Sequence, residues 1–303
     1  MIGRPLARLV RVVRPTVLLI VLLLLSSRVN AQITFPGASP VSAGNLVMVL
    51  KPETFDYTGG GSNTVDKNVL IYGASPRLAI IVQSNSFVSN SAIITEMGQS
   101  HRVIANGFGD TLIQPRYTIF QQDGPGSTFR IAPYIGAVLP TGEDNANSLM
   151  PRGGQPGTGA LATRDAITAS YQTLDWNAAA EVGYQANTAA AGYRVGNTLF
   201  ADAAFHYRMW PLELGEEVGG ELYASIEGNY TSSMANRIGG QSIPGTGGQT
   251  LLMDPGIIYT TRLYSFTLSG FLPAYQQIRD NGNRLNYGLL GAFRYSFFTS
   301  NHW

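Results

Sequence analysis

Apolar and polar residues alternate along most of this chain with a period of two. Between residues 176 and 185, for example, apolar or small side chains occupy the even positions and small or polar ones the odd positions. The same alternation recurs over 199–209, 221–230 and 286–297. A period of two predicts β-strands, because successive side chains of a strand point to opposite faces. No stretch beyond residue 31 keeps apolar residues at helical spacing over three turns, so we expect an all-β chain.

The pattern predicts about twelve antiparallel strands, and their connections alternate in length. Tight turns are expected at 75–76, 123–126, 175, 213–217 and 261–262, and long Gly-rich loops at 58–66, 89–108, 140–164, 187–196, 232–249 and 273–283. An even number of strands with short turns on one side and long loops on the other is typical of a transmembrane β-barrel with periplasmic turns and extracellular loops. A secreted β-sandwich would alternate equally, but it has no reason to segregate its loops by length. The expected strands are 45–57, 67–74, 77–88, 109–122, 127–139, 165–174, 176–186, 198–211, 219–230, 250–260, 263–272 and 286–298.

Prolines and aromatic residues refine this prediction. Prolines at 115, 133 and 255 fall inside expected strands, where each removes a ladder hydrogen bond, so we expect β-bulges there. Trp176 and Tyr184 lie eight residues apart on one strand face, a separation of roughly 20 Å along the membrane normal. Such a spacing is typical of aromatic girdles at the two interfaces of a bilayer. The aromatic ending at Trp303 resembles the last strand of barrels that the barrel-assembly machinery recognises.

The N-terminus reads as a secretory signal peptide. Four arginines precede an apolar run at 17–25, and the small tripeptide Val29-Asn30-Ala31 follows. The run is too short for the roughly 20 residues of a transmembrane helix. We therefore divide the chain into a signal peptide (1–31, cleaved near Ala31), a segment (32–44) that either lies in the periplasm or plugs the barrel, and an outer-membrane β-barrel (45–303).

Composition removes several classes of function. The chain of 303 residues has no cysteine, which excludes disulfides, cysteine nucleophiles and cysteine-ligated zinc. Its net charge of +1 argues against nucleic-acid binding. Hydrophobic residues make up 44%, which argues against disorder. Three histidines, at 101, 206 and 302, are too scattered for a dedicated metal site, so no metal or other cofactor is expected.

Two segments carry a resemblance to a known family. The run Gly107-Phe108-Gly109-Asp110 with a following Tyr117, and the strand end Leu139-Pro140-Thr141-Gly142-Glu143, resemble the signature of bacterial outer-membrane transporters named for the meta-pathway of phenol degradation. The hairpin at 72–78 is similar to one in that family. The specific likeness covers residues 72–144. It implies an outer-membrane barrel that passes hydrophobic compounds, and it implies no catalytic residues.

The alternation also predicts which charged side chains face the barrel lumen. Both signs occur, so no strong ion selectivity is expected. Ser225, His206 and Glu227 can be drawn as a hydrolytic triad, but mutual pairing inside a barrel is the simpler interpretation, and no catalytic residue is predicted. The lumen-lining candidates are Arg116, Arg130, Glu181, Asp202, His206, Arg208, Glu221, Glu227 and Arg294.

The sequence thus favours a passive channel or transporter for small, hydrophobic or aromatic molecules, with outer-membrane lipid as its surroundings and no nucleic acid as a partner. The alternatives are a closed structural barrel whose extracellular loops bind partners and, less favoured, a hydrolase embedded in a barrel.

Overall fold

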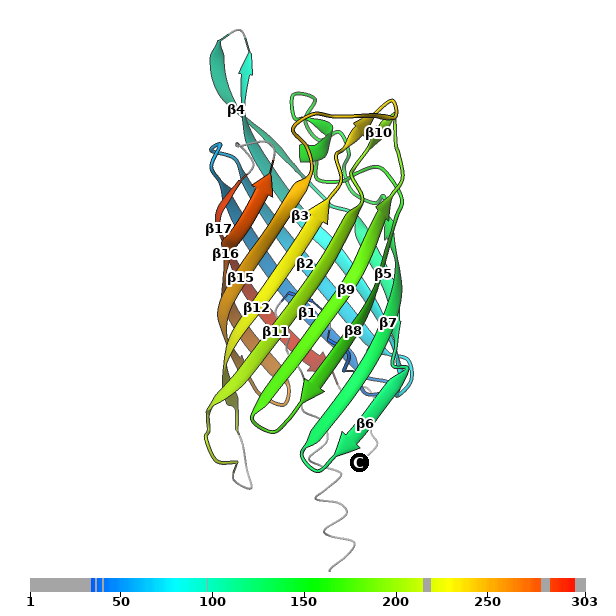
Figure 1. The fold of residues 1–303 in the computed structure, drawn as a ribbon, viewed down its shortest axis with the longest axis vertical. Helices are drawn as coiled ribbons and strands as arrows, with labels where there is room; N and C mark the ends of the chain where they lie inside the picture. Colours follow the sequence, from blue (N-terminus) through cyan, green and yellow to red (C-terminus); the bar gives the residue numbers. More distant parts are fainter. Residues whose placement is uncertain are drawn as a thin grey trace, which may run out of the picture. The chain divides into compact units, whose positions relative to one another are not determined.

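The chain folds into a closed antiparallel β-barrel (Figure 1). Its ring has twelve strand positions, which we call staves; one of them is made of two consecutive short strands. The computed structural model describes residues 34–35, 37–39, 41–96, 98–214, 219–278 and 284–297. The predicted signal peptide and the C-terminal residues 298–303 lie outside these ranges. Within them, no helix is long and apolar enough to cross a membrane.

Seventeen strands and one short 3-10 helix make up the secondary structure of the described residues. They are β1 (Leu46–Tyr57), β2 (Ser62–Gly73), β3 (Leu78–Glu96), β4 (Gln99–Gly107), β5 (Thr111–Tyr117), β6 (Phe120–Gly124), β7 (Ser127–Leu139), η1 (Arg152–Gly154), β8 (Ala162–Gln172), β9 (Trp176–Asn187), β10 (Tyr193–Arg194), β11 (Thr198–Trp210), β12 (Glu221–Ser233), β13 (Arg237–Ile238), β14 (Gln241–Ser242), β15 (Gly248–Thr260), β16 (Tyr264–Ile278) and β17 (Leu285–Phe297).

Each stave pairs with the next one along the chain, and β1 pairs with β17 to close the ring. The strands β5 and β6 form two parts of one stave, because both pair with β7. The all-β class and the count of twelve staves confirm the prediction. Closure leaves no free edge in the ring, which protects the sheet from pairing with other chains.

Several boundaries differ from the predicted ones. The segment 89–108 is a hairpin of β3 and β4 that projects beyond the barrel, not a loop (Figure 1). The segment 62–66 belongs to β2, so the connection between β1 and β2 is a tight turn at 58–61. We call this end of the barrel the loop end. The opposite end, which carries the connections 74–77, 125–126, 173–175, 211–220 and 261–263, is the turn end.

Of the bulges predicted at the prolines, those at Pro115 and Pro255 are wrong. Pro133 and Pro255 keep the register of their neighbours on β8 and β12, and Pro115 keeps its register with β3. The ladder between β5 and β7 instead omits the partners of Gln114 and Pro115 without changing register. Proline therefore costs hydrogen bonds here but does not add a residue to the strand. One extra residue lies opposite Pro133, because Arg116 pairs with Tyr134 but Phe120 pairs with Ile131. The other register shifts are at 56/57, 66/67, 208/210 and 251/252.

The two signature segments meet at the loop end. Asp110 accepts hydrogen bonds from the backbone N–H of Gly142 at 3.0 Å and from the N–H of Thr158 at 2.9 Å. A Cβ atom on Gly142 would lie 2.7 Å from the backbone of Gly109 and of Gly157. The glycines thus allow close backbone packing, and the aspartate joins the long loop 140–161 to the start of β5.

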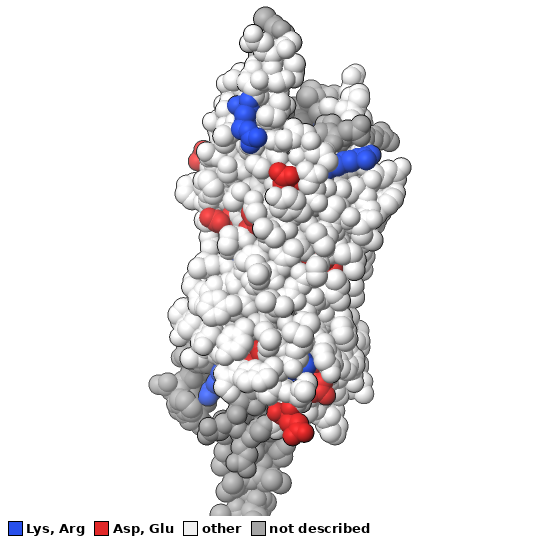
Figure 2. Space-filling view, turned by 90° about the vertical axis from the view of Figure 1, so that its left-hand side faces the viewer, with Lys and Arg blue, Asp and Glu red and all other residues white. Residues whose placement is uncertain are grey.

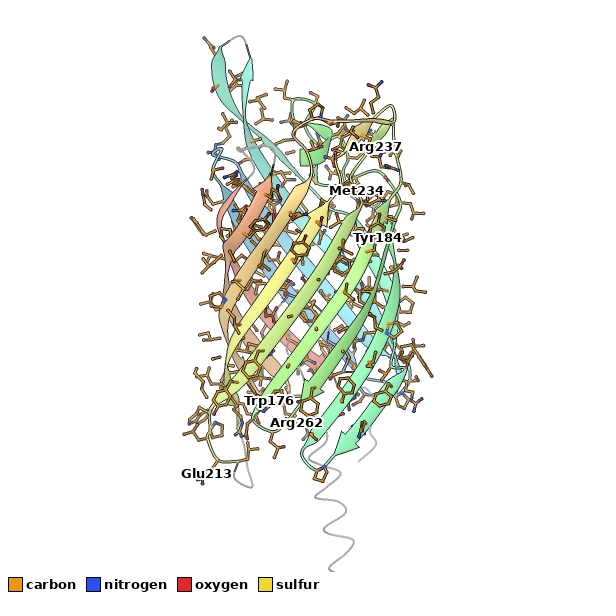
Figure 3. All side chains as sticks on the ribbon, viewed as in Figure 1. Trp176, Tyr184, Glu213, Met234, Arg237 and Arg262 are labelled. Atoms are coloured by element: carbon orange, nitrogen blue, oxygen red, sulfur yellow. The ribbon has the colours of Figure 1, made fainter. Side chains whose placement is uncertain are left out.

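The outer surface of the barrel is an apolar belt. Large apolar side chains are exposed all round the barrel wall, among them Val182, Leu268 and Leu289. In the face shown in Figure 2, charged side chains gather toward the two ends and the middle is nearly free of them. Trp176 lies toward the turn end and Tyr184 toward the loop end, as predicted for two aromatic girdles (Figure 3). Apolar residues outside and charged ones inside invert the plan of a soluble protein and fit a barrel surrounded by lipid.

Candidate functional site

Four buried carboxylates lie on neighbouring strands inside the barrel. In the antiparallel register, Glu181 of β9 faces Asp202 of β11, and Glu227 of β12 faces Asp254 of β15. All four side chains are buried. Like charges in directly opposite positions repel each other, so this arrangement depends on the hydrogen-bond donors around it.

Donors from several strands reach these carboxylates. The Tyr134 hydroxyl donates to Glu181 Oε1 at 2.9 Å. His206 Nε2 lies 3.1 Å from Glu227 Oε1, and both groups are buried. Asn229 Nδ2 donates to one oxygen of Asp254, a third member of this set. These contacts join β7 to β9, β11 to β12 and β12 to β15.

Arg164 supplies positive charge to the same wall. Its guanidinium carbon lies 3.8 Å from the centre of the buried Phe200 ring, and its Nη1 donates to Gln185 Oε1 at 3.3 Å. Gly183 makes room for this stack, because a Cβ there would lie 2.2 Å from Phe200 Cζ. The sequence prediction missed Arg164 because it placed this residue in the loop 140–164.

The hydrolytic triad drawn from the sequence is not assembled. Ser225 and His206 are register partners, yet Ser225 Oγ has no hydrogen-bond partner among the described residues. His206 Nε2 instead contacts Glu227. A nucleophile must be within hydrogen-bond reach of its base, so the three residues lack the required geometry. The described residues also contain no group of three or more His, Asp or Glu side chains that could hold a metal ion.

A second charged cluster was absent from the prediction. Lys51 Nζ lies 3.2 Å from Glu53 Oε1, and Lys67 Nζ lies 2.6 Å from Glu53 Oε2. These side chains come from β1 and β2. The alternation did not reveal Lys51 and Glu53, because apolar residues occupy both faces of β1 near the turn end. Lys67 was missed because it was expected to be the first residue of its strand.

The other predicted residues lie nearer the turn end. Arg208 is buried and forms an ion pair with Asp175 of the turn 173–175. Arg130 Nη2 lies 3.7 Å from Asp123 Oδ1. Glu221 accepts a hydrogen bond from Tyr223, its neighbour on the same face of β12. Arg294 is half-buried on β17 and faces Val49 and Ser265 in the register. Arg116 is buried and donates to the backbone carbonyl oxygens of Gly37 and Ser39.

One wall of the interior is apolar. Phe271 stacks on Phe55 with ring centres 5.0 Å apart, and Gly288 lies beneath this pair. The cluster extends from Leu285 at the loop end of β17 to Ile258 near the turn end of β15. The alternation did not reveal it, because these residues share the inward face with serine and threonine. Its buried members are Ile258, Phe271, Leu285 and Leu290, and Phe55, Tyr57, Tyr223, Leu252 and Ala292 pack against them.

Together these features define a transmembrane-type β-barrel whose interior has a charged wall and an apolar wall. A family model described as MetA-pathway of phenol degradation matches residues 52–297, and the chain belongs to this family. The match includes both signature segments and most of the barrel.

Comparison with known proteins finds distant likenesses among solved structures. No curated protein matches this chain. CdiB from Escherichia coli is similar at 10% identity and a TM-score of 0.40, covering 87% of this chain and 64% of that one, so this chain spans less than two thirds of CdiB. A NanC porin is similar at 12% identity and a TM-score of 0.44, covering 82% and 99%. OprD from Pseudomonas aeruginosa is similar at 10% identity and 0.37, covering 88% and 99%. With TM-scores below 0.5, none of these likenesses bears on what this chain does.

Proposed function

We propose that the protein spans the outer membrane and passes small hydrophobic or aromatic molecules without a chemical step. The loop end faces the outside and the turn end faces the periplasm, following the usual asymmetry of bacterial barrels. Membership of the family supports this proposal, since its name refers to the degradation of phenol. No cofactor and no catalytic residue take part.

The observation that carries the proposal is the apolar wall. Its residues extend from Leu285 at the loop end to Tyr223 near the turn end. A wall of this kind offers a hydrophobic solute contacts along most of the barrel, whereas a water-filled pore is lined by polar groups. The charged network adjoins this wall on β12 and β15 and extends from there over β11 and β9. The arrangement favours transfer of an apolar molecule along one side of the lumen.

Uptake of N-phenyl-1-naphthylamine tests this proposal. This aromatic probe fluoresces in lipid and is held back by an intact outer membrane. We expect cells that make the protein to take it up faster than cells without it. Replacing both Phe55 and Phe271 by Gln should lower the added rate about tenfold, because it removes about 1.4 kcal/mol or more of apolar contact.

The control for this experiment is an outward-facing substitution. Leu268 and Leu289 are exposed on the same two strands, β16 and β17, that carry much of the apolar wall. Replacing both by Ala should leave uptake unchanged. Heat-modifiable migration on a gel would show that each variant is folded. Equal uptake by the wild type and by the Phe55→Gln/Phe271→Gln variant would refute the proposed route.

A second candidate is a barrel that binds a partner through its loops. The projecting hairpin of β3 and β4 favours it, because Ile93 and Ile104 are exposed there. In that case deletion of the hairpin would abolish partner binding and leave probe uptake unchanged. The apolar wall inside the barrel would then have no role in function, which is why we place this candidate second.

A further inference from the structure

The chain before β1 turns back into the barrel. Ser42–Asn45 form a turn at the turn end, where Gly44 N–H donates to Gly73 O at 2.7 Å. A Cβ on Gly73 would lie 2.2 Å from Ser42 O, so only glycine permits this close approach. Thr34, Phe35 and residues 37–39 lie inside the barrel, beside the charged wall.

Arg116 and Arg130 hold the lower part of this segment. Arg116 donates to the carbonyl oxygens of Gly37 and Ser39, the latter at 2.7 Å. Arg130 Nη1 lies 3.4 Å from Ser39 Oγ. A single guanidinium that binds two carbonyls of one segment fixes its backbone rather than any side chain.

The upper part reaches the carboxylate network in the middle of the barrel. Thr34 N–H donates to Glu227 Oε2 at 2.9 Å, and the Thr34 hydroxyl lies 3.0 Å from Asn229 Oδ1. Lys51 Nζ lies 3.4 Å from Thr34 O. The segment therefore crosses from β5 to β12 and β1 and occupies the lumen between them.

Apolar contacts complete the fit. Phe35 is buried against Ala179 of β9 and Ala204 of β11, and Ala38 is fully buried. The two wall alanines leave room for the ring where larger side chains would fill the space. The barrel wall is thus shaped to receive this segment.

We propose that the segment Thr34–Ser39 is a plug, which closes the lumen at rest and leaves its seat when a solute passes. This inference rests on the proposed channel function. The contacts of Thr34, Phe35 and Gly37–Ser39 are made with side chains of the barrel wall, and these residues pair with none of the barrel strands. The segment can therefore leave without breaking the sheet. Removal of the signal peptide near Ala31 would leave it tethered only through the turn before β1.

A cysteine pair tests the plug in the full chain, which contains no cysteine of its own. Phe35→Cys combined with Ala204→Cys places two thiols at a contact between plug and wall. When reduced, this variant should conduct small ions in KCl about tenfold better than the wild type. The loss of one buried phenyl ring should shift the equilibrium between the seated and the released plug by at least about tenfold. Oxidation or a short bis-thiol reagent should abolish the added conductance, and reduction should restore it.

Two further variants keep the test decisive. Ala180→Cys with Ala203→Cys joins the same two strands on the outer surface, where these residues are register partners, and its oxidation should change nothing. Arg116→Lys keeps the charge but lacks the guanidinium group, whose two terminal nitrogens donate to two carbonyl oxygens of the plug. This variant should also raise conductance. Heat-modifiable migration would again show that each variant is folded.

The plug is refuted if the oxidised Phe35→Cys/Ala204→Cys barrel conducts as well as the reduced one. It is equally refuted if neither that variant nor Arg116→Lys conducts better than the wild type. Ion conductance separates this result from the proposed function. Gated conductance without uptake of the aromatic probe would support the plug and contradict the proposed solute class. Probe uptake that crosslinking leaves unchanged would support the solute class and contradict the plug.

Discussion

At the residue scale, many charged side chains of this barrel point into its interior, away from lipid. An ionised side chain in a lipid-facing position is costly, and a buried one needs partners. Here Glu227 contacts His206 and Thr34, and Glu181 contacts Tyr134. The sequence predicted that these acids face inward from alternation alone. It also placed His206 on the strand beside Glu227. It could not predict Tyr134 or Thr34 as partners, because they come from segments far away along the chain.

The substitution Gly183→Ala tests how closely the barrel interior is packed around Phe200. A Cβ at this position would lie 2.2 Å from Phe200 and 2.5 Å from Asp165 O. Gly183→Ala should therefore lower the free energy of unfolding by about 1–3 kcal/mol through overpacking. Gly228→Ala is the matched control, since its Cβ would lie 3.7 Å from the nearest atom. Urea unfolding in lipid vesicles measures both, and equal stability of the two variants would contradict the account.

At the element scale, regular strands were predictable and irregular ones were not. Strands β9, β11, β12 and β17 alternate cleanly, and their predicted bounds lie close to the observed ones. The end of β3 and the start of β2 are rich in serine, asparagine and threonine, which are typical of loops, so both were predicted as loops. Cross-strand partners made them strands instead: Ser62 and Ser91, for example, are joined by their hydroxyl groups. Local composition carries no information about such partners.

The substitution Asp110→Ala tests the junction between the long loop 140–161 and β5. It accepts two backbone N–H groups and the hydroxyl of Thr158, the last at 2.6 Å. Asp110→Ala should remove these three hydrogen bonds at a total cost of about 1–3 kcal/mol, since the Gly142 contact is partly buried and the two Thr158 contacts are exposed. We expect faster hydrogen exchange at Gly142 and Thr158, while the middle of β9 keeps its protection. Uniform change across the barrel would show that the aspartate does not act locally.

At the scale of the whole molecule, closure of twelve staves produces a molecule with two distinct ends. Arg237 lies at the loop end and Arg262 at the turn end, and both are exposed (Figure 3). The number of staves and the segregation of loops were predictable because they depend on periodicity and turn residues. The apolar wall was not, because its residues come from five strands, β1, β12, β15, β16 and β17, that only the closed barrel brings together.

Thiol labelling tests the proposed orientation. Arg237→Cys should react with a membrane-impermeant maleimide in intact cells, and Arg262→Cys should react only after the outer membrane is opened. Both variants replace an exposed arginine in a protein without cysteine. The opposite labelling pattern would invert the assignment of the two ends.

The central claim is that an apolar solute travels along the inner apolar wall. Photolabelling of the barrel in native outer membrane with an aryl azide, followed by peptide mass spectrometry, tests it most directly. We expect labels on inward residues such as Phe271 and Leu290, in addition to lipid-facing ones such as Leu268 and Leu289. Labels confined to the lipid-facing residues would contradict it.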